Sequence, residues 1–318
     1  MQPAATHDAG VSDDRSGVVR RLHVDDFSDD PNAFFDRIAR DPVIVQGIVP
    51  NGTTRPTTFD QLRRRLSGTM VFAIESATQQ HRAVLADDLF TGVLTGDRRY
   101  NVVDHGIAGT PLADLFPTPG FLGDNWLTSL HVADGQYAKS LVISPAGAST
   151  PLHVDSYGLS GWMYLVEGHK HWTLYPPWCR QALFDPMFKT WYDDSSPDAD
   201  SGEIPAGRYP FAHAAAAERR AGTLDAGELL YFPAGWIHSV RTSATSAGFG
   251  GSVLNASTAM DAMQVWLIER SNHEAGSLDF KSIYERMRAS ARPRDREAAD
   301  RALALCAEWE AQMIGRQD

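Results

Sequence analysis

The sequence predicts a mainly β protein with flanking helices, and three observations indicate this class. Between residues 137 and 256, short runs of β-branched, aromatic and aliphatic residues are separated by Gly, Pro and Asp, which is typical of a β-sandwich or barrel. The segment before residue 137 mixes shorter strand and helix patterns. Residues 257–318 instead carry apolar residues at helical spacing.

The N-terminal part is expected to begin with a loose tail over residues 1–17, which is polar and acidic. In PNAFFDRIAR (31–40), a proline at the first helical position precedes apolar residues at helical spacing, which predicts a short helix. PVIVQGIV (42–49) is β-branched and predicts a strand. The threonines that open TTFDQLRRRL (57–66) are suited to capping a second helix.

The central part predicts a series of short strands, in KSLVISP, GWMYLVEG, HWTLYPP, GELLYFP, WIHSV and GGSVLNA. Between them, residues 185–210 are rich in Asp, Ser and Pro and predict a long surface insertion of the kind that often carries specificity. We therefore expect one catalytic domain over 18–256, with its core at 137–256, and a helical region over 257–318.

The last predicted helix, DREAADRALALCAEWEAQMI, places apolar residues on one face. They are Ala302, Leu305, Cys306, Trp309 and Met313. Such a face usually packs against the body of the same subunit, which is our first interpretation. A homodimer formed through the C-terminal helices is the alternative.

Composition excludes some classes of partner. There are 29 Lys and Arg against 40 Asp and Glu, a net charge of -11, which argues against binding to nucleic acid or to an anionic membrane surface. The two cysteines, Cys179 and Cys306, form neither a disulfide framework nor a zinc knuckle. No signal peptide and no run of about 18 apolar residues is present, so we expect a cytoplasmic protein.

The candidate chemistry starts in STPLHVDSYG (149–158). Side chains two apart on a strand project to the same face, so His153 and Asp155 can offer an imidazole nitrogen and a carboxylate oxygen to one point. Alone, a His-x-Asp pair is weak, because chance produces it often. A third candidate, His238, lies in GELLYFPAGWIHSV, where Trp236, His238 and Val240 share a face.

Two histidines and one carboxylate leave metal positions open, as in non-haem Fe(II) oxygenases. Zinc accepts the same ligands and would leave a water for hydrolysis, so the ligands alone do not select the metal. Lys170 discriminates, because in VEGHKHWTLYPP it alternates in phase with Trp172 and Leu174, and a lysine between apolar neighbours needs an anion. His169 and His171 fall on the opposite face and are interpreted as structural or surface residues.

TPLHVDSYGLSGWMYLVEGHKHWTLYPP followed by GELLYFPAGWIHSV resembles the JmjC branch of the cupin superfamily, the 2-oxoglutarate and Fe(II) dependent oxygenases. It is most similar to the small JmjC hydroxylases. The resemblance implies a double-stranded β-helix (cupin or jelly-roll, JmjC type) with N-terminal α/β elements and C-terminal helices. It implies Fe(II) and O2 as cofactors and 2-oxoglutarate as cosubstrate.

The resemblance also assigns roles to single residues. It implies that Fe(II) is bound by His153, Asp155 and His238. It implies that the cosubstrate is held by Lys170, Thr150, Asn255 and Tyr137. The sequence departs from the family where an asparagine should follow Trp162, because Met163 stands there, and the loop SVRTSATSAGFGGSVL (239–254) looks longer than the family's.

The expected function is therefore hydroxylation of a side chain of a protein, peptide or amino-acid-like substrate, with release of succinate and CO2. N-methyl demethylation, a cupin hydrolase or isomerase that does not use 2-oxoglutarate, and a non-enzymatic binding module are the alternatives. The acidic run at Asp193, Asp194, Asp198 and Asp200 is compatible with a basic substrate, although acidic loops usually serve solubility.

Overall fold

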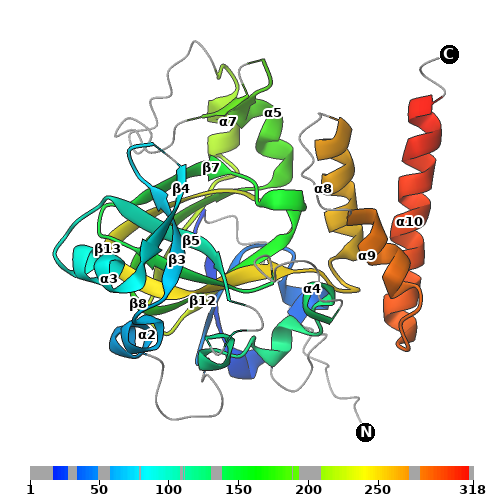
Figure 1. Ribbon diagram of the computed structural model, residues 1–318. Coiled ribbons are helices and arrows are strands. Elements are labelled where there is room, and N and C mark those ends of the chain that lie inside the picture. The colour runs from blue at the N-terminus through cyan, green and yellow to red at the C-terminus, as the bar shows by residue number, and fades with distance from the viewer. Residues whose placement is uncertain are drawn as a thin grey trace, which may run out of the picture.

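Figure 1 shows the computed structural model, a β-rich body with a layer of C-terminal helices on one side. The structure describes residues 17–27, 34–48, 58–78, 80–107, 110, 112–129, 138–187, 189–192, 209–271 and 280–314. The predicted tail up to residue 16, Tyr137 and residues 193–208 of the expected insertion lie outside the described residues.

Eleven of the described strands form one hydrogen-bonded sheet that folds over on itself, in the order β1-β2-β12-β8-β13-β6-β5-β3-β4, with β11 on β8 and β7 on β13. They are β1 (Arg20–His23), β2 (Val43–Gln46), β3 (Met70–Glu75), β4 (Gln80–Leu85), β5 (Tyr100–Gly106), β6 (Ser140–Ser144), β7 (Ser149–His153), β8 (Ser160–Tyr175), β11 (Arg220–Asp225), β12 (Leu229–Phe232) and β13 (Ile237–Val253). A separate pair joins β9 (Phe184–Asp185) to β10 (Thr190–Trp191).

The two long strands, β8 and β13, divide this sheet into two facing layers. They pair with each other along nearly their whole lengths and each changes its outer partner half-way. The first part of β8 pairs with β12 and its second part with β11. The first part of β13 pairs with β7 and its second part with β6. This arrangement is a jelly-roll barrel, which confirms the predicted fold class.

Two sequence-based expectations about these strands are wrong. GWMYLVEG and HWTLYPP are one strand, β8, which bends at Gly168 with φ of 92°. A Cβ at Gly168 would lie 2.4 Å from the carbonyl oxygen of Thr245, so only glycine lets the strands approach there. Residues 239–254, expected as a loop, belong almost entirely to β13, whose register shifts between Thr242 and Gly248 let a polar, glycine-rich segment stay paired.

Helices cover the outside of the barrel. They are α2 (Phe59–Leu66), α3 (Ala86–Leu94), α4 (Trp126–Ser129), α5 (Arg180–Leu183), α7 (Ala212–Ala216), α8 (Ala259–Ser271), α9 (Phe280–Met287) and α10 (Pro293–Ile314). Thr58 caps α2 as predicted, in a reciprocal pair of hydrogen bonds with Gln61. The helix expected over 31–40 is a π-helical turn, Phe34–Ile38, in its described part.

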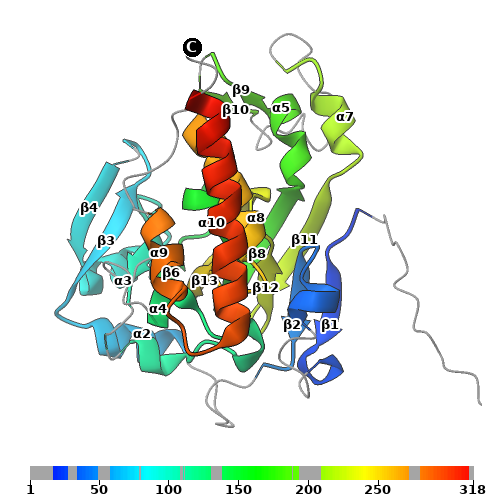
Figure 2. The same ribbon diagram turned by 90° about the vertical axis from the view of Figure 1, so that its right-hand side faces the viewer.

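The C-terminal helices pack against the body of the subunit, and α10 runs along the outside of α8 and α9 (Figure 2). Ala302 and Cys306 of α10 are buried in a cluster with Met263 of α8 and Tyr284 of α9. This confirms the first interpretation of the apolar face, and a homodimer through these helices stays a prediction. Among the described helices, none is both long and apolar enough to cross a membrane.

Candidate active site

The two long strands bring the three predicted metal ligands together. His153 is the last residue of β7, and Asp155 follows it, just before the short 3-10 turn Ser156–Gly158. His238 is the second residue of β13 and stands directly opposite His153 in the ladder. Residues 85 positions apart in the chain therefore meet because β7 and β13 are neighbours in the jelly roll.

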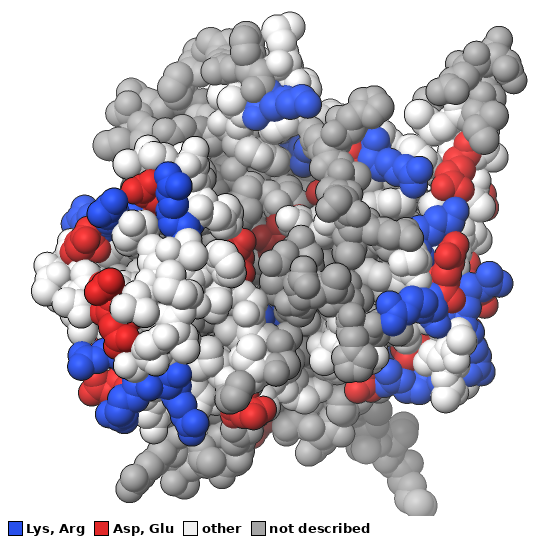
Figure 3. All heavy atoms as spheres, viewed as in Figure 1, with Lys and Arg blue, Asp and Glu red and all other residues white. Residues whose placement is uncertain are grey.

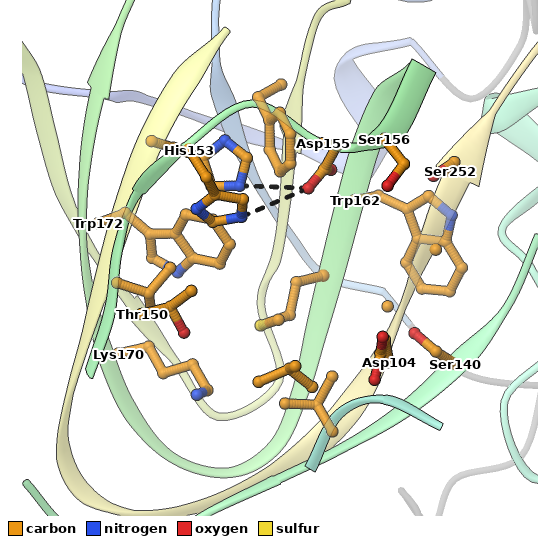
Figure 4. Close-up of a pocket in the computed structure, with 18 of the residues that line it drawn as sticks. Asp104, Ser140, Thr150, His153, Asp155, Ser156, Trp162, Lys170, Trp172 and Ser252 are labelled. Atoms are coloured by element: carbon orange, nitrogen blue, oxygen red, sulfur yellow. Dashed lines mark ion pairs between the residues drawn. The ribbon is translucent and has the colours of Figure 1, made fainter. Parts of the chain in front are cut away.

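The ligand atoms of these three residues lie within 4.8 Å of one another. Both imidazole Nε2 atoms are 3.6 Å from Oδ1 of Asp155, and the two ring centroids are 4.2 Å apart. Figure 4 shows the Asp155 carboxylate facing the His153 ring, and its dashed lines mark the two imidazole–carboxylate pairs. Two nitrogens and one oxygen converging from one side suit a divalent metal ion with open positions opposite.

Both histidines are oriented by their own backbone. Nδ1 of His153 donates to the carbonyl of Pro151 at 2.8 Å, and Nδ1 of His238 donates to the carbonyl of Trp236 at 3.0 Å. With the proton on Nδ1, each Nε2 keeps a lone pair directed toward Asp155. Such outer contacts fix the tautomer and orientation of metal-binding imidazoles.

The site favours the metal-binding protonation states of His238 and Asp155. Burial and the neighbouring His153 lower the pKa of His238 to about 4, so this imidazole is neutral at pH 7. Burial opposes ionisation of Asp155, but the two histidines hold its pKa below the ordinary value. Burial also opposes the charged form of His153, yet Asp155 raises its pKa overall, so a metal ion would compete with a proton for this ring.

A cavity of about 370 Å³ lies between the two layers and has these residues at one end. Aromatic and aliphatic side chains and small hydroxyls form most of its wall. They include Val142, Trp162, Met163, Trp172, Phe232, Val240, Ser140, Ser156 and Ser252. Gly161 leaves the room for Asp155, because a Cβ there would lie 2.9 Å from Oδ2 of Asp155 and 2.2 Å from Cζ of Phe232.

Lys170 lines the same cavity and is 3% exposed. Its Nζ donates to the hydroxyl of Ser144 at 2.8 Å and to the hydroxyl of Thr242 at 3.1 Å. Burial lowers its pKa to about 7. Within the described part of the chain no carboxylate forms an ion pair with Lys170, so the cavity holds a cationic group without a counter-ion.

The other predicted cosubstrate residues differ in position. Thr150 lines the cavity and lies on the same wall as Lys170 and Trp172 (Figure 4). Asn255 does not reach the cavity. Its Oδ1 accepts from the backbone N–H groups of Ser257 and Thr258 and its Nδ2 donates to the carbonyl of Leu122, so it closes the turn that leads into α8. Since both ends of its side chain are used locally, its predicted cosubstrate contact is not supported.

His169 and His171 point away from the cavity, as alternation predicted. Nδ1 of His169 lies 2.6 Å from the carboxylate of Asp225, and Nδ1 of His171 lies 2.9 Å from the hydroxyl of Thr223. Both contacts join β8 to β11 on the outer surface. These two histidines therefore link neighbouring strands and do not reach the metal site.

Sequence reasoning missed two residues that hold Lys170 and two residues that line the cavity. Ser144 and Thr242, the partners of Lys170, stand 26 and 72 residues from it in the chain and carry no motif. Met163, noted only as a departure from the family pattern, lines the cavity beside Trp162. Asp104, on β5, also lines the cavity, and only the pairing of β5 with β6 places it there.

A jelly-roll barrel with two histidines and a carboxylate converging between its layers defines the cupin-like class. In agreement with this, the family model of the cupin-like domain matches residues 114–266. The chain therefore contains a cupin-like domain over these residues, and the proteins that it resembles include JmjC-type oxygenases.

Three relatives illustrate this similarity. The human "2-oxoglutarate and iron-dependent oxygenase JMJD4" is 30% identical over 132 residues, which cover 41% of this chain and 30% of that protein. The Caenorhabditis elegans "Bifunctional arginine demethylase and lysyl-hydroxylase psr-1" is 30% identical over 142 residues, 41% of this chain and 32% of that protein. The Caenorhabditis elegans "JmjC domain-containing histone demethylation protein 1" is 24% identical over 194 residues, 54% of this chain and 17% of that protein. The matches thus span about a third or less of these relatives.

Proposed function

We propose that this chain is an Fe(II)- and 2-oxoglutarate-dependent oxygenase that hydroxylates a side chain of a protein substrate. One observation carries the proposal, namely that a His, Asp, His cluster and a buried lysine without a counter-ion share one cavity. The names of the relatives, an iron-dependent oxygenase and a lysyl-hydroxylase, support the same chemistry.

The residues present fit a ferrous ion. His153, Asp155 and His238 would hold it, since their donor atoms already lie within 4.8 Å of one another. A site with two histidines and one carboxylate keeps positions free for a chelating cosubstrate and for O2. Zinc would fit the same donors, so the selection rests on the remainder of the cavity.

Lys170 favours iron with 2-oxoglutarate over a zinc hydrolase site. A buried ammonium is costly, and an anion that enters the cavity removes the cost. The carboxylate of 2-oxoglutarate remote from the metal would meet Lys170, with the Thr150 hydroxyl on the same wall as a second donor. A hydrolase that binds only metal and water would gain nothing from this lysine.

When bound, iron supplies the oxidising chemistry, in which O2 and 2-oxoglutarate yield succinate, CO2 and a hydroxylated product. The residues of the chain position the metal ligands and exclude water from the site. The Nδ1 contacts of His153 and His238 hold the imidazoles in place. Trp172 and Phe232, both buried, pack beside His238 with ring centroids 5.6 and 4.5 Å away and keep water from that side.

An exposed apolar strip beside the cavity supports a polypeptide substrate. Met70, Phe72 and Ile74 share one face of β3, and Leu85 of β4 stands opposite Met70. Ile74 lines the cavity, whereas Met70 and Phe72 are 54% and 58% exposed. Apolar surface that continues into a catalytic cavity suits a polypeptide, which would bury it on binding.

One face of the molecule carries charges of both signs. On the face drawn in Figure 3, lysine and arginine side chains are interspersed with aspartate and glutamate side chains, and no field of one sign spreads over the residues that the structure describes.

Anaerobic addition of Fe(II) and 2-oxoglutarate tests the proposal, because chelation by the cosubstrate gives a visible metal-to-ligand charge-transfer band. Admission of O2 should then produce succinate, and a substrate should gain the mass of one oxygen. His153→Ala should abolish the band, while His171→Ala, on the opposite side of the sheet, should retain it. Metal binding without any band would favour the hydrolase or isomerase alternative.

A further inference from the structure

Asp104 is a charged side chain of the cavity wall for which neither the metal nor the cosubstrate has a use. It lies on β5, is exposed, and lines the same cavity as His153, Asp155 and Lys170. Figure 4 shows it beside Ser140, on the wall away from Thr150 and Lys170. In the described residues its carboxylate has no hydrogen bond or ion pair, in contrast to Asp155.

A β-bulge places Asp104 there. Between the pairs Val102–Ile143 and His105–Leu141, β5 advances by three residues and β6 by only two. The extra residue breaks the strict alternation of side chains, so that the consecutive residues Val103 and Asp104 both line the cavity. In a regular strand one of them would face the opposite side. Bulges are over-represented next to active sites because they redirect side chains in this way.

The charges in the loaded cavity leave the Asp104 carboxylate without a partner of opposite sign. The proposed function places a dication against Asp155 and a dianion against Lys170, so the charges of metal, cosubstrate, Asp155 and Lys170 sum to zero. Asp104 is then the uncompensated charge among the described residues that line the cavity. An uncompensated carboxylate on the wall of a cavity attracts a cation.

We propose that Asp104 is a specificity-determining residue that binds the cationic side chain of the substrate, a lysyl or arginyl group. This inference rests on the proposed function for the position of the substrate. The remainder of the cavity wall fits such a side chain, because the aromatic and aliphatic groups of Trp162, Met163 and Ile74 would pack against its methylene stem.

Peptide binding tests this assignment without knowledge of the natural substrate. The probes are blocked peptides of the form Ala-Ala-X-Ala-Ala, in which X is lysine, arginine, norleucine or glutamate. They are titrated into the full chain loaded with Zn(II) and N-oxalylglycine, an inert analogue of 2-oxoglutarate. Binding is followed by the fluorescence of Trp162 and Trp172, which line the cavity, and by ligand-observed NMR.

The lysine and arginine peptides should bind about two- to fivefold more tightly than the norleucine peptide, because an ion pair with an exposed carboxylate contributes at most about 1 kcal/mol. Asp104→Asn should remove this preference, and Asp104→Lys should transfer it to the glutamate peptide. Asp41→Asn is the matched control, since Asp41 is exposed, lies outside the cavity and carries the same charge. That variant should keep the wild-type preference.

The assignment is wrong if wild-type protein does not distinguish lysine from norleucine up to the solubility of the peptides. It is equally wrong if the preference survives in Asp104→Asn. The charge-transfer band of wild-type protein with Fe(II) and 2-oxoglutarate is recorded in parallel. A band without charge preference would overturn only the role of Asp104, whereas absence of the band would overturn the proposed function itself.

Discussion

His153 and His238 stand opposite each other in the ladder between β7 and β13, and both Nε2 atoms lie 3.6 Å from the same carboxylate oxygen of Asp155. Cross-strand neighbours are held at a fixed separation by backbone hydrogen bonds. The sheet therefore preorganises the metal site, and substitutions that disturb Asp155 alone should weaken it.

Gly161→Ala is such a substitution. The added methyl group would meet Phe232 and Oδ2 of Asp155, so the carboxylate must move. We expect the affinity for Fe(II) to fall about 10- to 100-fold, as for other residues that orient metal ligands. Gly120→Ala is the control, because no heavy atom lies within 4 Å of a Cβ at that position. Unchanged metal affinity in Gly161→Ala, measured by competition with a chelator, would show that Asp155 has more freedom than the packing indicates.

Lys170→Met should stabilise the protein and abolish cosubstrate binding. Burial lowers the pKa of Lys170 from its ordinary value of 10.5 to about 7, so unfolding takes up a proton between these values and stability rises with pH across that window. At pH 7 the variant should gain about 2–4 kcal/mol in free energy of unfolding, since about 1.4 kcal/mol per pKa unit is recovered and two hydrogen bonds are lost. Urea unfolding at pH 7 and at pH 10 measures the difference.

Lys139→Met separates the effect of removing a buried charge on stability from the effect on cosubstrate binding. Lys139 is the other buried lysine of the described chain that has a lowered pKa, to about 8, and it donates to the carbonyl of Ala113, outside the cavity. This variant should gain less stability and should bind 2-oxoglutarate normally. Loss of cosubstrate binding in both variants would show that the effect is general and not a property of Lys170.

The affinity for 2-oxoglutarate should fall as the pH rises above 7. The free site has Lys170 with a pKa of about 7, and a bound carboxylate favours the protonated form, so binding takes up a proton at higher pH. For metal-loaded protein we expect the dissociation constant of 2-oxoglutarate to be at least about tenfold larger at pH 8.5 than at pH 6.5. Calorimetry in buffers of different ionisation enthalpy would detect the proton uptake, and a flat profile would contradict it.

Removal of the apolar strip should affect polypeptide substrates selectively. Phe72→Ser and Met70→Ser take away exposed side chains next to the cavity. In a pool of cellular peptides the hydroxylated fraction should fall several-fold, because an apolar contact of this size contributes about 1 kcal/mol to binding. Leu94→Ser, with 54% exposure on α3, is the control. Equal losses in all three variants would point to stability and not to docking.

The sequence was sufficient for the residues whose positions depend on local geometry. Alternation along a strand placed His153 with Asp155, and Lys170 with Trp172, on the correct faces, and these predictions needed no knowledge of strand pairing. Ser144, Thr242 and Asp104 could not be found in this way. Their contribution depends on which strands become neighbours and, for Asp104, on a bulge that breaks the alternation.

Two further expectations also depend on long-range pairing. Residues 239–254 are rich in Gly, Ser and Thr, which is typical of loops, yet the partner strands β8 and β6 supply their hydrogen bonds. Asn255 follows that strand and was assigned to the cosubstrate through the resemblance. In the structure it lies where the chain turns into α8, so its amide serves the helix start.

The regular pairing of β13 with β8 from His238 to Thr242 has a consequence for cosubstrate choice. His238 stands opposite Leu174 and Thr242 stands opposite Lys170, so the ladder separates the metal ligand from the lysine by a fixed four-residue step of roughly 13 Å. The backbone thus fixes the length of dicarboxylate that can reach both the metal and Lys170. Oxaloacetate, one carbon shorter, and 2-oxoadipate, one carbon longer, would each leave one end of the molecule out of register.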